Sequence, residues 1–363
     1  MIEKIKDYYD QFSSMASRAV GIDLGTSNTL IYLKGKGIII EEPSVVALDK
    51  ISRQILAIGN NAKNMVGRTP QNISAIRPLR DGVISNYEIA EKMIEYFLEL
   101  SDEGIINYKI AQPRLVIGIP TSATEVQKRA VREAALSAGA KNAYLIEESL
   151  AAAIGSEVDI SSASGKMIVD IGGGTTETAV LALGTIIAGT SIRFAGDAMD
   201  EAIKEYVRQV YNISLGEISS EEIKIIYGSA WPLDNEIDFQ IKGQDIISGL
   251  PKEVNVSTIE VREALNSPIE EIINGIKNII EQTPSELITD VMKSGINVTG
   301  GGALLSGIDK RIANATNFPV KVSPEPKRSV IRGIAKIIEN KNILKILEAS
   351  MQLREVTKKI SIN

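Results

Sequence analysis

Short apolar runs typical of buried strands recur along this chain, and glycine-rich turns follow several of them. The same order of segments occurs in two places far apart in the sequence. Each place has an apolar run, then a glycine turn, and then two further apolar runs. This order predicts a three-stranded antiparallel meander in each half, with glycine in its first turn. The predicted strands lie within 19–33 and at 38–40 in the first half, and at 166–170, 177–183 and 186–193 in the second half.

Apolar residues at helical spacing separate and follow the two meanders, so strands and helices alternate as in an α/β fold. For the helix over 123–138 we predict a capping box of Ser122 and Glu125. Residues 60–73 predict a small insert with a helix, 76–84 a loop-and-turn segment, and 232–256 a more polar β-hairpin. Further predicted helices are 87–100, 149–155, 200–211, 220–227, 258–283, 285–293 and a stretch from Val330, and further strands are 44–48, 54–58, 114–119, 143–146, 295–299 and 320–322.

Three glycine-bearing loops carry the candidate chemistry. Glycine lets backbone N–H groups approach phosphate oxygens, and an aspartate before the glycines offers a hard carboxylate for Mg²⁺. Two related loops and a third therefore predict one nucleotide held between duplicated halves. The loops contain Asp23, Gly25, Thr26, Ser27 and Asn28; then Asp170, Gly172, Gly173, Gly174 and Thr175; and finally Gly300, Gly301, Gly302 and Ala303.

Composition removes several classes of function. The 363 residues suit two large domains, and the net charge of −6 argues against a nucleic-acid partner. Cysteine and histidine are both absent, which excludes disulfides, thiolate nucleophiles, Cys/His zinc sites and Ser-His-Asp triads. No run of about 18 apolar residues exists to span a bilayer, and the lack of cysteine fits a cytosolic protein.

Together the three loops resemble the phosphate-1, phosphate-2 and adenosine signatures of the superfamily of actin, the heat-shock chaperone ATPases and hexokinase. They are most similar to those of the MreB-type bacterial actins, and the resemblance covers nearly the whole chain. It implies an actin-like duplicated ribonuclease H-type fold, with two α/β domains, each split into two subdomains, around a nucleotide cleft. Supporting segments are 42–45, 75–84, 145–148, 151–155 and 196–200. Subdomain IA would comprise 1–46, 80–161 and 329–363, IB 47–79, IIA 162–197 and 263–328, and IIB 198–262.

The resemblance also implies ligands and roles at the phosphates. Asp23 and Asp170 would hold Mg²⁺ largely through water; alternatively, both only stabilise their own turns. The backbone amides of the first loop would bind the β- and γ-phosphates of ATP or ADP from one side, and Gly172, Gly173 and Gly174 from the other.

For hydrolysis, Glu148 matches the family's water-positioning glutamate and Thr175 its hydroxyl partner. Glu147 is a competing candidate, and a purely structural role is a third alternative. Ser149 stands where the family usually has proline, which puts the hydrolysis rate in question but not ATP binding.

At the nucleoside, Glu221 and Lys224 match family contacts and share one helix face, although a solvated helix face would look similar. Glu222 replaces the usual arginine. Residues 300–303 would let adenine lie flat against backbone, with a plain turn as the alternative, and Gly196 belongs to the same expected site.

The function implied is a cytoskeletal ATPase whose ATP-dependent filaments determine cell shape. Its partners would be further copies of itself, in protofilaments paired antiparallel through the helix over 123–138, together with the membrane surface and other cytoskeletal or shape proteins. The location would be cytoplasmic, at the inner face of the cell membrane. The Ile-, Lys- and Asn-rich composition suggests an AT-rich genome, and hence the hypothesis of a wall-less bacterium using filaments for helical shape or motility. A heat-shock-type chaperone ATPase, which would need a following substrate domain, and a small-molecule kinase, which would need an acceptor pocket with a base, are the alternatives.

Three segments are candidates for membrane contact. Ile2, Ile5, Tyr9 and Phe12 predict an amphipathic N-terminal helix that either packs on the protein or lies on a membrane. The apolar loop 105–110 either packs locally or contacts the membrane. The tail 354–363 is either solvated or makes a weak electrostatic contact with anionic lipid or an acidic partner.

Overall fold

Two five-stranded sheets with the same strand order form the framework of the computed structural model, which describes residues 19–101 and 112–340. The orders are β3-β2-β1-β9-β10 and β13-β12-β11-β17-β18. In each sheet an antiparallel meander of three strands is extended by two parallel strands. The predicted duplication is therefore confirmed. The strands are β1 Ala19–Leu24, β2 Asn28–Leu33, β3 Gly37–Pro43, β9 Arg114–Ile119 and β10 Asn142–Glu147, then β11 Lys166–Ile171, β12 Thr176–Ala182, β13 Thr185–Ile192, β17 Ile296–Thr299 and β18 Val320–Val322.

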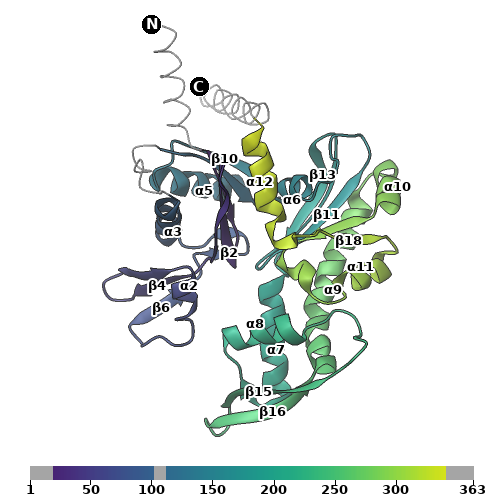
Figure 1. The fold of residues 1–363 in the computed structure, drawn as a ribbon. Helices are drawn as coiled ribbons and strands as arrows, with labels where there is room; N and C mark the ends of the chain where they lie inside the picture. Colours follow the sequence, from purple (N-terminus) through teal and green to yellow (C-terminus); the bar gives the residue numbers. More distant parts are fainter. Residues whose placement is uncertain (1–18, 102–111, 341–363) are drawn as a thin grey trace.

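Helices cover the outer face of each sheet and also fill the space between the two sheets (Figure 1). On the first sheet, α3 and α5 pack their apolar faces against β1 and β9. On the second, α9 and its neighbours cover β11 and β12. The helices are α2 Asn60–Lys63, α3 Tyr87–Leu100, α5 Glu125–Ser137, α6 Glu148–Gly155, α7 Gly196–Tyr211, α8 Glu217–Tyr227, α9 Thr258–Gln282, α10 Ser285–Ser294, α11 Ile308–Thr316 and α12 Ser329–Glu339.

The helices α6 and α12 connect the two halves through a shared core. One apolar cluster contains Val116 of the first sheet, Ile168 of the second, and buried residues of both helices. The two helix backbones come so close that a Cβ at Gly155 would overlap the carbonyl of Ser329. This close approach explains why residue 155 is glycine.

Two smaller sheets extend the lobes away from this joint. In the first lobe β5-β4-β6 forms a three-stranded sheet beside α2, and in the second lobe β14-β15-β16 lies below α7 and α8 (Figure 1). Their strands are β4 Val46–Asp49, β5 Ile55–Ile58, β6 Ile73–Ile76, β14 Ile213–Ser214, β15 Asp238–Asp245 and β16 Pro251–Ser257, and a further hairpin pairs β7 Leu79–Arg80 with β8 Val83–Ile84.

Several local predictions were wrong. The capping box of α5 is formed by Thr124 and Gln127, not by Ser122 and Glu125. The Ala123 N–H donates to the carbonyl of Pro120, so a turn ends there and Thr124 is the last extended residue before the helix. The segment 76–84, predicted as loop and turn, contains β7 and β8, and α11 and β14 were not predicted.

Three segments predicted to contact a membrane lie outside the described residues: the predicted N-terminal helix, the loop 105–110 and the tail 354–363.

Candidate functional site

The glycine turns of the two meanders face each other across a cavity of about 350 Å³. A Cβ at Gly173 would overlap the hydroxyl of Ser27, and one at Gly174 would lie 2.6 Å from Oγ1 of Thr26. The hydroxyl of Thr26 also accepts a hydrogen bond of 2.9 Å from the Gly82 N–H. Only glycine at 173 and 174 allows the two turns to come this close, and it leaves the backbone of the second turn accessible at the cavity.

Nearly all the residues predicted for the site line this one cavity. Ala303 does not line it, since its side chain is buried in the core of the second lobe. The predicted residues that line it are Asp23, Gly25, Thr26, Ser27, Asn28, Glu148, Asp170, Gly172, Gly173, Gly174, Thr175, Gly196, Glu221, Lys224, Gly300, Gly301 and Gly302.

Asp23 and Asp170 place two carboxylates at the bottom of the cavity. Burial, with the charge of Asp170 in addition, raises the pKa of Asp23 to about 8. Burial raises the pKa of Asp170 to about 6, although its Oδ1 accepts a 2.8 Å hydrogen bond from the Thr299 hydroxyl. Two carboxylates that resist ionisation beside each other are a favourable place for a cation.

The donor set fits Mg²⁺ rather than a metal bound by protein alone. Within residues 19–101 and 112–340, no group of three or more acidic side chains could hold a metal ion. Mg²⁺ is commonly bound by one or two carboxylates and completed by water and phosphate oxygens. The aspartate pair beside the two glycine turns offers that arrangement.

Glu148 lies in the cavity, whereas Glu147 is not among the lining residues. Glu147 is the last residue of β10 and occupies the N-cap position of α6 without a capping hydrogen bond from its side chain. Glu148 is the first residue of the helix. Burial raises the pKa of Glu148 well above its ordinary value, and the charges of Glu177, Asp23 and Asp170 add to the shift. The next residue, Ser149, shares a 2.7 Å hydrogen bond with the hydroxyl of Thr121.

Glu177 is a buried carboxylate behind the site that the sequence analysis missed. Its Oε2 accepts a 2.8 Å hydrogen bond from the Thr121 N–H, and its Oε1 has no partner among the described residues. Burial raises its pKa, and the hydrogen bond from the Thr121 N–H acts in the opposite direction. The available signal was an acidic residue inside an otherwise uncharged strand, β12.

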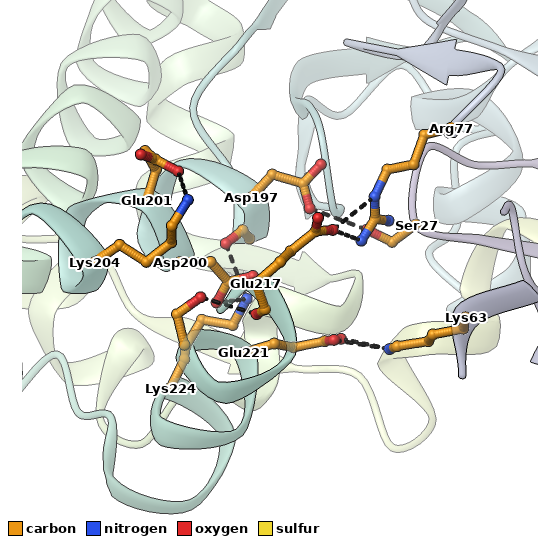
Figure 2. A network of polar contacts seen from close by, with 12 residues as sticks. Ser27, Lys63, Arg77, Asp197, Asp200, Glu201, Lys204, Glu217, Glu221 and Lys224 are labelled. Carbon is orange, nitrogen blue, oxygen red and sulfur yellow. Dashed lines mark hydrogen bonds and ion pairs between the residues drawn. The ribbon is translucent and has the colours of Figure 1, made fainter. Parts of the chain in front are cut away.

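Where the sequence analysis expects the nucleoside, α8 contributes Glu221 and Lys224 to the lining of the cavity, and Figure 2 shows both side chains. The Nζ of Lys224 donates to the carbonyl of Gly196 at 2.9 Å and pairs with Asp200 at 2.8 Å. Burial raises the pKa of Asp200 to about 6 against the lowering effect of Lys224. Apolar Ile225, Ile226 and Leu304 complete this side of the cavity.

The start of α7 was a supporting segment in the sequence analysis, but its acidic residues were not assigned to the site. Asp197 and Asp200 both line the cavity. The Asp197 N–H donates to the carbonyl of Gly173 at 2.7 Å, and its carboxylate accepts from the Ser27 hydroxyl at 3.2 Å. Asp197 and Asp200 are three residues apart near the start of α7, and this spacing is the sequence signal that could have identified them.

Duplicated sheets whose glycine turns face one another across a cavity define an actin-like protein. Comparisons with known proteins agree. The sequence model of the MreB/Mbl protein matches residues 17–346, and the chain belongs to that family. The cell shape-determining protein Mbl of Bacillus subtilis is 44% identical over 327 residues, which are 90% of this chain and 97% of the relative. The cell shape-determining protein MreB of Escherichia coli is 43% identical over 333 residues, 91% and 95% of the two chains.

Solved structures lead to the same fold. The crystal structure of MreB5 of Spiroplasma citri bound to AMPPNP has a TM-score of 0.86 and 35% identity, and the match covers 92% of this chain and 99% of that one. The MamK double helical filament has a TM-score of 0.74 at 21% identity, over 89% and 99% of the chains, and shows the fold alone. Within the described part of the chain, no helix combines the length and apolarity needed to cross a membrane.

Proposed function

We propose that this protein is an ATP-binding bacterial actin that assembles into filaments in an ATP-dependent way and hydrolyses ATP slowly. The observation that carries the proposal is the pair of glycine turns, each with an acidic residue, that face one cavity from opposite lobes. The Spiroplasma citri relative has been crystallised with AMPPNP and with ADP, which supports a nucleotide as the ligand.

The residues around the cavity suit a triphosphate and its magnesium ion. Backbone amides of both turns would bind phosphate oxygens, and Asp23 and Asp170 would hold Mg²⁺. When bound, Mg²⁺ would neutralise charge on the phosphates. The apolar side chains around Ile225 and Leu304 would contact the adenine, and Glu221 and Lys224 would contact the ribose hydroxyls and the adenine edge; all four residues line the cavity.

For hydrolysis we assign Glu148 to position the attacking water, with Thr175 as its hydroxyl partner. The ionised carboxylate of Glu148 would orient this water and accept its proton. Bound Mg²⁺ would offset the charges of Asp23 and Asp170, which add to the effect of burial and of Glu177 in raising the pKa of Glu148. The water oxygen bonds to the γ-phosphorus, and the bond to the bridging oxygen breaks with its electron pair left on ADP.

We further propose that four subdomains surround the cleft, with the boundaries predicted from the sequence. The filaments would consist of this chain, lie at the inner face of the cell membrane and serve cell shape. Support comes from the names of the Mbl and MreB relatives, which are cell shape-determining proteins.

Sedimentation and electron microscopy of the purified protein test this function. We expect pelleted filaments with ATP and Mg²⁺, and their loss with EDTA or without nucleotide. Failure to form polymers across salt and nucleotide conditions would contradict the proposal and favour a chaperone ATPase or a small-molecule kinase.

A further inference from the structure

Two ion pairs cross from the first lobe to helix α8 of the second lobe at the edge of the cavity (Figure 2). Lys63, the last residue of α2, contacts Glu221 at 2.7 Å. Arg77, directly after β6, donates to Glu217 from Nε at 3.1 Å and from a terminal nitrogen at 2.5 Å. Both cations belong to the small extension of the first lobe, and both carboxylates to one helix.

The two acceptors occupy the same face of α8. Glu217 and Glu221 are four residues apart, so they lie one turn above each other on the helix. Glu221 lines the cavity, whereas Glu217 does not. The Lys63–Glu221 pair therefore reaches a residue of the cavity lining, and the Arg77–Glu217 pair lies one helical turn away from it on α8.

The charges on the two sides are complementary. Burial lowers the pKa of Arg77, but its bond to Glu217 and the charges of Asp197, Glu217 and Glu221 outweigh this and raise the pKa overall. The second lobe thus offers carboxylates from α7 and α8 to the cations of the first lobe. Electrostatic attraction across the cavity favours the closed arrangement of the lobes.

We propose that Lys63–Glu221 and Arg77–Glu217 form an interlobe clasp that retains the bound nucleotide. The inference rests on the proposed function, since it takes the cavity to hold a nucleotide. With both pairs formed, the far ends of the lobes are tied together opposite the α6–α12 joint. Nucleotide release requires both pairs to separate.

The expected effect is moderate because the paired side chains are between 23% and 47% exposed. Partly exposed ion pairs contribute little individually and are screened by salt. Loss of one pair should therefore speed nucleotide release roughly 1.5- to 5-fold. Because this effect is electrostatic, it should shrink as the salt concentration rises.

Release of the fluorescent analogue mant-ATP from the full chain, with Mg²⁺ present, measures the clasp. We expect Arg77→Glu to release it faster at low salt, and the charge swap Arg77→Glu with Glu217→Arg to restore the rate. The matched control is Lys204→Glu, which breaks a 2.6 Å pair with Glu201 within α7 and should leave release unchanged. Restoration by the swap excludes misfolding as the cause.

Cross-linking tests the clasp by holding the two lobes together instead of separating them. The chain contains no cysteine, so Arg77→Cys with Glu217→Cys offers a short bismaleimide only the two engineered sites. Cross-linked protein loaded with mant-ATP should release it more slowly than wild type.

The results of these experiments distinguish failure of the proposed clasp from failure of the proposed nucleotide-binding function. If wild type does not bind mant-ATP, both fail. If wild type binds it but Arg77→Glu releases it no faster than Lys204→Glu, or the cross-link leaves release unchanged, only the clasp is overturned.

Discussion

Asp23 and Asp170 show how burial of single side chains creates the electrostatics of the proposed cation site. Each carboxyl belongs to a hairpin strand, and folding brings two like charges from opposite halves of the sequence into one cavity. Their raised pKa values express the cost of ionising both without a counter-ion. Sequence reasoning could identify these residues from their glycine context, but not their mutual repulsion.

This cost predicts a pH dependence for the nucleotide-free protein. The pKa of Asp23 rises from 3.8 to about 8 on folding, so the folded state holds its proton more tightly than the unfolded chain. The free energy of unfolding should therefore fall as pH rises from about 4 to about 8 and change little above. Asp23→Asn should remove most of that fall, because asparagine has no proton to release.

Urea denaturation at pH 5 and pH 8 measures this difference. The exposed Asp234→Asn, which also removes one carboxylate, is the control and should behave like wild type. An unchanged slope in Asp23→Asn would show that its carboxyl is not the group responsible.

At the scale of elements, the start of α6 decides which of two adjacent glutamates serves the site. Because Glu147 still belongs to β10 and Glu148 opens the helix, their side chains point in different directions. Only Glu148 lines the cavity. The sequence left the choice between them open, and the strand-to-helix boundary favours Glu148.

We therefore predict that Glu148→Gln slows phosphate release roughly 10²- to 10⁴-fold while ATP affinity and filaments are retained. Glu147→Gln is the matched control and should hydrolyse ATP like wild type. Phosphate release and mant-ATP binding would be measured on both variants. Equal loss in the two, or none in Glu148→Gln, would move the water-positioning role elsewhere.

Most elements could be predicted because their apolar periodicity is long enough to see. The helix α3 and the strand β9 have the predicted bounds. The strands β7, β8 and β14 have two residues each, so no period exists in them and only tertiary pairing creates them. The helix α11 buries only Ile308 and Ile312, too sparse a pattern to separate it from a polar loop.

At the scale of the molecule, a joint at one end and ion pairs at the other hold the two lobes around the cavity. The glycine loops could be found from sequence because each is a local motif. The contacts of Lys63 and Arg77 with α8 could not, since they depend on how two distant segments approach after folding. The duplicated glycine loops therefore predict the site from sequence. The ion pairs that hold the two lobes together at that site can be identified only in the folded structure.

The proposed nucleotide site can be tested by a crystal structure of this protein with Mg²⁺ and AMPPNP. We expect the triphosphate between the β1–β2 and β11–β12 turns, with backbone amides of both turns on its oxygens and the metal beside Asp23 and Asp170. A nucleotide bound elsewhere, or one contacted by a single turn with the other withdrawn, would contradict it.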